Sequence, residues 1–358
     1  MDKYGKNINM TLKADITTLE NVVEQIMRSA SVGDDSFELK LKKLLKSYKI
    51  AIIKDGIISS LSITDKDYVC NTINLIEKNV GSFLNGHYER CFNSIKKTWF
   101  SNKGGVQLGE MFSKNYNLTP RTELYRIRRK EAGEIFTHKE MFHVPFEKRG
   151  VLDNYRYSLS GYPCLYCGFS VMTCWEEMHR PPLDSFMVSA LYVRKNLKLL
   201  DLRLYQSDSI ESYQDLYKYI VMLPLIMACS VKVKKDSDKF KPEYIMPQLL
   251  LSTICNTNDV ANPQYDGIIY TSSRVDLNFG FGDRHLYDNV VIPVKESKES
   301  GMCDWLCDKF SITDPICYEY EIIRHGFFES NDTDPYSKSY FGILESRLKN
   351  ETFYLPNN

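Results

Sequence analysis

Hydrophobic residues recur at the three- and four-residue intervals of an amphipathic helix through the first hundred positions of the chain. Three such series are Leu19–Met27, Phe37–Tyr48 and Val69–Phe83. Thr17-Thr18-Leu19-Glu20 has the spacing of a capping box, which predicts that the first helix begins there. Apolar stripes of this kind usually pack against other helices, so the pattern predicts a mostly helical region over residues 1–119.

One stretch interrupts this helical pattern. Asp55-Gly56 lies between apolar residues in Ile50–Ile58, and Asp-Gly is a preferred two-residue turn of β-hairpins. We therefore expect a short hairpin between the second and third helices.

From Glu123 onward the pattern changes to short apolar runs separated by helical stretches. The predicted strands are Leu124–Arg128, Pro163–Gly168, Phe186–Val193, Lys198–Leu202, Gly267–Tyr270 and Asn289–Val294. The predicted helices between them are Ser170–His179, Ile210–Met227 and Tyr244–Cys255. Strands interrupted unevenly by helices favour a mixed α+β domain over a regular doubly wound one.

The C-terminal part of the pattern is weaker. It predicts a helix at Met302–Phe310 and a strand at Ile316–Ile323. After Gly326 the chain is polar, and we expect a loosely attached tail with one helix at Tyr340–Leu348. The chain is therefore divided into a helical region (1–119), a mixed domain (120–326) and a tail (327–358).

Charge and hydropathy limit the classes of partner that we expect for this protein. Lys and Arg together number 46, as do Asp and Glu, so the formal net charge is zero. A balanced chain lacks the positive field that concentrates a protein on DNA or RNA, which argues against nucleic acid as a partner. The first thirty residues are polar, and no stretch approaches the roughly 20 apolar residues that cross a bilayer. We expect a cytoplasmic protein with no membrane partner.

The ten cysteines are expected to be reduced thiols, because the sequence shows no export signal. Cys164-Leu165-Tyr166-Cys167 is the one short-spaced pair that suggests zinc, with Cys303 and Cys307 to complete a site. Residues three apart on a strand point to opposite faces, and small thiols are ordinary in a buried helix. We therefore expect no metal.

Two common catalytic fingerprints are missing. Gly280-Phe281-Gly282 has no strand, turn and helix around it, so it does not indicate a dinucleotide fold. Ser158, Ser160 and Ser170 are not in a Gly-x-Ser-x-Gly elbow, which argues against an α/β-hydrolase.

Four short motifs instead place polar residues in or beside the predicted strands. They are Leu124-Tyr125-Arg126, the stretch Arg156-Tyr157-Ser158 through Gly161 and Pro163 to Leu165-Tyr166, Thr173-Cys174-Trp175-Glu176-Glu177, and Asp266-Gly267-Ile268-Ile269-Tyr270-Thr271-Ser272-Ser273. Their order and spacing resemble the RES domain, a family named for its Arg, Glu and Ser. The resemblance extends from Glu123 to Val294 and includes the run Asn289–Pro293.

This resemblance implies a fold like that of the ADP-ribosyltransferases, with a mixed β-sheet core and flanking helices, and it implies consumption of NAD+. RES proteins degrade NAD+ by hydrolysis or phosphorolysis, or transfer ADP-ribose to a protein. They commonly act as toxins that a partner antitoxin holds in check.

Matching by position assigns the family residues to this chain. The family glutamate lies eleven residues after the strand tyrosine, which selects Glu177 over Glu176. Tyr155 stands where the family has Gly, and Ser158 where it has Asn. The residues so implied are Arg126, Glu177 and Ser272 for catalysis, and Arg126, Arg156, Tyr166 and Ser158 for binding NAD+.

These residue types suit the chemistry. An arginine binds a pyrophosphate through two parallel charge-assisted hydrogen bonds, the role implied for Arg126 and Arg156. Expulsion of neutral nicotinamide leaves a cationic ribose, which the carboxylate of Glu177 can stabilise. The role that the resemblance implies for Tyr166 is to stack on the nicotinamide ring, and the role that it implies for Ser272 is to hold the sugar or the second arginine, Arg156.

Three functions remain open from the sequence. The first is an NAD+ glycohydrolase or phosphorylase acting as a toxin or defence effector, and the second is a mono-ADP-ribosyltransferase that modifies a protein. The third is a non-catalytic RES-fold interaction module, suggested by the long region before residue 120. That region would control the domain by oligomerising, by covering the pocket or by sensing a trigger, which makes a second copy of the chain an expected partner. The resemblance adds an antitoxin or immunity protein to the expected partners.

Overall fold

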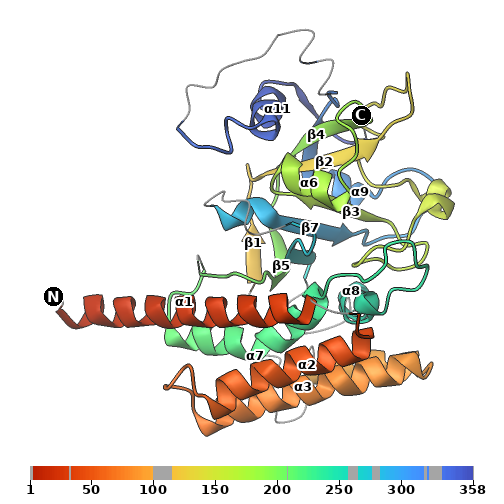
Figure 1. The fold of residues 1–358 in the computed structure, drawn as a ribbon. Helices are drawn as coiled ribbons and strands as arrows, with labels where there is room; N and C mark the ends of the chain where they lie inside the picture. The colour runs from red at the N-terminus through yellow and green to blue at the C-terminus, as the bar shows by residue number, and fades with distance from the viewer. Residues whose placement is uncertain are drawn as a thin grey trace. The chain divides into compact units, whose positions relative to one another are not determined.

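A computed structural model of the chain describes residues 3–31, 34–99, 115–207, 209–256, 265–275, 283–317, 321 and 333–357. The chain divides into two compact units, and neither is a single stretch of sequence (Figure 1). The helical unit contains residues 1–115, 155–157 and 202–264. The sheet unit contains residues 116–154, 158–201 and 265–358.

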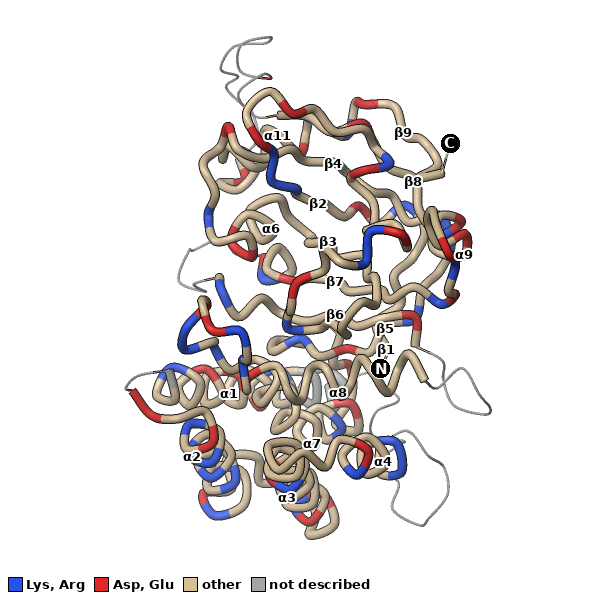
Figure 2. The backbone as a smooth tube through the Cα atoms, turned by 90° about the vertical axis from the view of Figure 1, so that its right-hand side faces the viewer, with Lys and Arg blue, Asp and Glu red and all other residues tan. Residues whose placement is uncertain are grey.

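The helical unit packs its early helices against two later ones. The early elements are α1 (Lys3–Ser31), α2 (Phe37–Lys49), the π-helical turn η1 (Ile50–Lys54), α3 (Ile63–Leu84) and α4 (Tyr88–Trp99). The later elements are α7 (Tyr213–Ser230), the 3-10 turn η3 (Pro242–Tyr244) and α8 (Ile245–Asn256). Helix α2 is predominantly basic, with Glu38 as its one acidic residue, whereas α3 carries residues of both signs (Figure 2).

The two later helices explain why the unit is discontinuous. Both α7 and α8 are apolar on nearly every side, and most of their side chains are buried. A helix that is hydrophobic all round must be covered by protein. In this unit α1, α2 and α3 contact α7, while α3 and α4 contact α8. The structure therefore places residues 202–264 with the N-terminal helices, whereas the sequence pattern had placed them within the mixed domain.

Two local predictions in this unit are wrong. Helix α1 continues through Thr17 and Thr18, whose hydroxyls donate to the carbonyls of Lys13 and Ala14 at 2.9 Å instead of capping a new helix. The expected hairpin at Ile50–Ile58 is also absent, because η1 prolongs α2 into this stretch. Helix α4 was not predicted.

The described residues of the sheet unit form a nine-stranded sheet, in the order β1-β5-β6-β7-β3-β2-β4-β8-β9. The mixed α+β fold class expected from the sequence is confirmed. The strands are β1 (Asn115–Leu118), β2 (Glu123–Arg129), β3 (Cys164–Gly168), β4 (Phe186–Val193), β5 (Leu197–Leu202), β6 (Gly267–Thr271), β7 (Asp288–Pro293), β8 (Phe310–Thr313) and β9 (Phe353–Tyr354).

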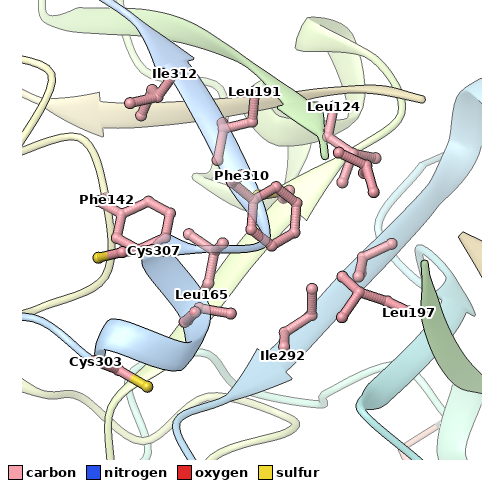
Figure 3. Packing of buried hydrophobic residues seen from close by; sticks show 14 of the residues in the cluster. Leu124, Phe142, Leu165, Leu191, Leu197, Ile292, Cys303, Cys307, Phe310 and Ile312 are labelled. Atoms are coloured by element: carbon pink, nitrogen blue, oxygen red, sulfur yellow. The ribbon is translucent and has the colours of Figure 1, made fainter. Parts of the chain in front are cut away.

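Successive residues of a strand point to opposite faces of this sheet. Leu124 belongs to a core on the face we call the first, with Leu165, Leu191, Ile292 and Phe310, whose side chains converge in Figure 3. The second face carries Tyr125 and Ile127 of β2, and it is covered by α6 (Val171–Glu177) and α11 (Tyr340–Leu348). These two helices therefore determine which side chains can lie against the second face.

The C-terminal elements differ from prediction. Only Asp304–Cys307 of the expected helix Met302–Phe310 forms helix α9, and β8 begins at Phe310, the last residue of that stretch. Ile316 makes one bridge to Val188, and most of the strand expected after it lies outside the described residues, as does Gly280–Gly282. Helix α11 has the expected bounds, but the tail is not loose, because β9 pairs with β8 and α11 packs on α6.

The remaining described elements are two 3-10 turns, η2 (Phe146–Val151) and η5 (Arg284–Tyr287). Within the described ranges, no helix combines the length and the apolar character that a bilayer crossing requires.

Candidate functional site

Helix α6 carries Glu177 at its last turn, and its first turn is fixed by hydrogen bonds. Ser170 is the N-cap, and its Oγ accepts a hydrogen bond from the Thr173 amide at 3.1 Å. The hydroxyls of Ser170 and Thr173 both donate to the carbonyl of Leu286 in η5, each at 2.6 Å. The helix is therefore tied to the segment that precedes β7.

A glycine lets α6 approach the sheet closely. A Cβ at Gly168, the last residue of β3, would lie 2.8 Å from Cys174 Sγ and 3.3 Å from Asn289 Oδ1. Contacts under 3 Å require something to move. The absence of a side chain at Gly168 thus sets the spacing between α6 and the strands that carry its partners.

The carboxylate of Glu177 is held on both oxygens. Oε1 accepts hydrogen bonds from Ser272 Oγ at 2.7 Å and from Asn289 Nδ2 at 2.9 Å. Oε2 lies 3.5 Å from Nε of Arg274, and the Glu177 side chain is still 30% exposed. A fixed carboxylate that solvent can reach is suited to act on a small molecule.

The partners of Glu177 come from the ends of β6 and β7. Ser272 follows β6, and its amide donates to the carbonyl of Tyr287 at 2.8 Å. Its Oγ accepts a hydrogen bond from the amide of Arg274 at 3.2 Å. Asn289 lies opposite Tyr270 of β6, so the register of the two strands brings Ser272 and Asn289 to one carboxylate.

The turn η5 beside this site is braced by a chain of polar side chains. His285 Nδ1 lies 2.7 Å from Oδ2 of Asp288, and Nε2 lies 3.0 Å from the hydroxyl of Tyr116. Thr271 Oγ1 donates to Oδ1 of Asp288 at 2.9 Å. These contacts hold the segment whose carbonyls, at Leu286 and Tyr287, bind α6 and Ser272.

The chain turns sharply after Glu177. His179 and Arg180 have φ angles of 61° and 53°, a left-handed conformation that costs a non-glycine residue about 1–2 kcal/mol. His179 Nδ1 lies 3.3 Å from Nη1 of Arg274. Backbone outliers of this kind gather at functional sites, where surrounding contacts hold them.

The neighbouring glutamate has a different role. Glu176 is 4% exposed, and its Oε2 lies 2.8 Å from Nε of Arg180. Adjacent helical residues differ in direction by about 100°. Of the two glutamates, Glu177 is therefore the one that faces Ser272 and solvent.

The sheet register separates Arg126 from this site. Tyr125 lies opposite Gly168, and Gly168 lies opposite Asn289, so all three share the second face. Arg126 comes one residue later and lies on the first face with Leu124. Its Nη1 donates to the carbonyl of a β3 residue at 2.9 Å.

That β3 residue is Tyr166, whose side chain belongs to the second face, two residues before Gly168 and opposite Val291. Tyr166 is partly buried and Ser158 is buried; both lie in the sheet unit.

Arg156 belongs to the helical unit. There its guanidinium donates to the carbonyls of Cys229 at 2.7 Å and Val231 at 3.0 Å, at the end of α7, and lies 5.2 Å from the ring centroid of Tyr244. A cation suits this end of a helix. Of the residues expected from the sequence, the structure thus joins Glu177 directly to Ser272.

Sequence reasoning missed Arg274 and Asn289 as site residues. Arg274 lies two positions after Ser272, and Asn289 is the one polar residue in the run Asn289–Pro293. A polar amide in an otherwise apolar strand was the signal that could have identified Asn289. Among the described residues, no cluster of three or more His, Cys, Asp or Glu side chains could hold a metal ion.

Comparison with known proteins places this site within a matched region. The family described as "RES domain" matches residues 123–296. The chain is also 34% identical over 258 residues to "Putative toxin YopC" of Bacillus subtilis (strain 168). That alignment covers 68% of this chain and 57% of the relative, so the chain spans little more than half the length of the relative. No solved structure gives a match.

Proposed function

We propose that this chain, whose residues 123–296 belong to the RES domain family, is an enzyme that cleaves NAD+ at the nicotinamide–ribose bond and acts as a toxin. The observation that carries the proposal is the carboxylate of Glu177, oriented by Ser272 and Asn289 and open to solvent. The toxin assignment rests on the name of the relative, and an antitoxin is the partner it implies.

In the proposed reaction the N-glycosidic bond breaks, and its electron pair leaves with nicotinamide. C1″ of the nicotinamide-side ribose becomes cationic, and the negative charge of Glu177 stabilises it. Water attacks C1″ and loses a proton to give ADP-ribose, or phosphate attacks C1″ to give the ADP-ribose 1″-phosphate. At about 4 Å, opposite charges near a protein surface attract by roughly 4 kcal/mol, and solvent reduces this at an accessible site.

Arg126 remains a proposed ligand of the pyrophosphate. Its guanidinium donates to the main-chain carbonyl of Tyr166 in the structure, so binding of NAD+ requires this hydrogen bond to be exchanged. The proposal does not use Arg156, which belongs to the helical unit and donates to carbonyls of that unit. Tyr166, Ser158 and Ser272 remain proposed contacts of the nicotinamide and the sugars.

The test is nicotinamide release from NAD+ by the purified protein, with and without phosphate. We compare wild type with Glu177→Gln, which keeps an acceptor oxygen but removes the charge, and with Glu176→Gln as the matched control. We expect release by the wild type and by the control, and at least a 100-fold lower rate from Glu177→Gln. Equal rates from all three proteins would refute the proposal.

Labelled NAD+ added to a lysate distinguishes the alternatives. A discrete labelled protein band, with little free ADP-ribose, would replace hydrolysis with protein modification. No release and no label from a folded wild type would leave a non-catalytic interaction module. Cellular NAD+ that falls on expression of wild type, but not of Glu177→Gln, is the expected result for a toxin of this kind.

A further inference from the structure

The C-terminal segment, residues 333–357, lies beyond the region matched by the RES family but packs on the helix that carries Glu177. Leu344 and Leu348 of α11 share a core with Val171 and Cys174 of α6. The rings of Phe341 and Trp175 lie 5.3 Å apart between centroids. The segment thus covers α6 with apolar contacts along its length.

The same segment also supplies a polar contact to the start of α6. Glu345 Oε1 accepts a hydrogen bond from the amide of Val171 at 2.7 Å and another from the hydroxyl of Tyr336 at 2.5 Å. Glu345 is 8% exposed and Tyr336 is 4% exposed. The first amides of a helix have no partner within the helix, which gives a buried acceptor oxygen a reason to be here.

The geometry of α6 makes this contact important for Glu177. The helix has seven residues, so its first residue lies only about 9 Å along the axis from its last. A tilt of about 10° at the Val171 end would move the Glu177 end by about 1.5 Å. Misplacement by about 1 Å is enough to lower a catalytic rate by about 100-fold.

We propose that Glu345 is a positioning residue, and that through the amide of Val171 it holds α6 in the orientation in which Glu177 meets Ser272 and Asn289. The proposal rests on the proposed function for its catalytic consequence, but its structural part stands separately. It makes the C-terminal segment part of the catalytic unit.

Two substitutions separate positioning from packing. Glu345→Leu keeps the bulk of the side chain and removes both acceptor oxygens, whereas Glu345→Gln keeps an oxygen that can accept from Val171 and Tyr336. Glu351→Gln, an exposed residue of the same segment, is the control. Tyr336→Phe is the milder variant should Glu345→Leu not fold, because it removes one of the two donors to Glu345.

The first readout is nicotinamide release well below the melting temperature of each variant. We expect Glu345→Leu to lower kcat by about 100-fold while KM for NAD+ changes less than threefold, because Glu177 acts in the transition state. Glu345→Gln should restore kcat to within fivefold of wild type. A folded Glu345→Leu variant with wild-type kcat, or a loss confined to KM, would overturn the proposal.

The second readout does not depend on activity. Hydrogen–deuterium exchange of residues 171–177 should be at least tenfold faster in Glu345→Leu, or faster by a smaller factor in Tyr336→Phe, with β3 and β7 unchanged. Unchanged exchange of α6 would overturn the anchoring itself. Faster exchange together with a wild type that releases no nicotinamide would refute the enzymatic function and leave the anchor in place.

Discussion

Ser272 and Asn289 donate to the same oxygen of Glu177, and this shared acceptor gives a quantitative prediction. A hydrogen bond to a charged group contributes about 1.5–3 kcal/mol. If both bonds serve to orient Glu177, then Ser272→Ala or Asn289→Ala alone should lower kcat by roughly 10- to 150-fold. The remaining donor limits each loss, since it still restrains the oxygen.

The double variant should lose more than the sum of the two single losses. With both donors gone, Arg274 near Oε2 is the remaining restraint on the carboxylate among the described residues, and its Nε lies 3.5 Å away. We expect a coupling of about 1 kcal/mol, which is in the lower part of the range for residues that share a partner. The sign follows from the structure, because each donor substitutes in part for the other.

The assay is kcat for nicotinamide release from wild type, both single variants and the double variant. Ser160→Ala, at an exposed position, is the control for loss of a serine hydroxyl. Additivity within about 0.3 kcal/mol would show that the two side chains act independently, and the reasoning from a shared oxygen would be refuted.

Three further predictions concern stability. Burial raises the pKa of Glu345 to about 7 from its ordinary value of 4.5, so the native state keeps a proton that the unfolded chain releases. The free energy of unfolding should therefore fall by about 3 kcal/mol as pH rises from 4.5 through 7. Urea titrations at a series of pH values should show a weaker pH dependence for Glu345→Gln than for wild type. The same pH dependence in both proteins would contradict this. Gly168→Ala should lower the free energy of unfolding by about 1–3 kcal/mol, because the added Cβ would overlap Cys174. An unaltered melting temperature would contradict the close approach of α6 to the sheet. Deleting residues 1–99 should expose α7 and α8 and give aggregates on size-exclusion chromatography, whereas a soluble monomer would show that these helices do not need the cover.

Local patterns predicted six of the nine strands in the described part of the chain and missed β1, β8 and β9. The bounds of β4 agree with the sequence prediction at both ends, and those of β2, β3, β5, β6 and β7 agree within one residue. Each of these strands is a short apolar run with turn residues beside it, and that information is contained in the run itself. Helix α11 was predicted with the same success and for the same reason.

The sequence pattern could not indicate which elements pack against one another. The apolar residues of α7 and α8 indicate burial but do not specify which surfaces bury them, so these helices were placed with the wrong part of the chain. Threonine is a residue type that often caps helices, which is why Thr17 and Thr18 suggested a helix start. A threonine hydroxyl can equally donate to the carbonyl four residues earlier within a continuous helix, as both do here.

The candidate site likewise combines residues that local motifs identified with residues whose position depends on strand pairing. Glu177 and Ser272 were found because their motifs are local. Asn289 depends on the pairing of β6 with β7, and the position of Arg126 depends on which face of β2 it occupies; both are properties of register. The tail was expected to be loose because its composition is polar, although Leu344 and Glu345 bind α6.

The interleaved sequence of the two units affects what proteolysis can do to this protein. The backbone passes from the helical unit into β1, returns for α7 and α8, and leaves again for β6. One cleavage between α4 and β1 would free no domain, because α1 to α4 would still be held by their packing on α7 and α8. A protein cleaved at this point should therefore migrate as one particle under native conditions and separate into two fragments only in denaturant. Such a cut cannot activate the protein by releasing the sheet unit.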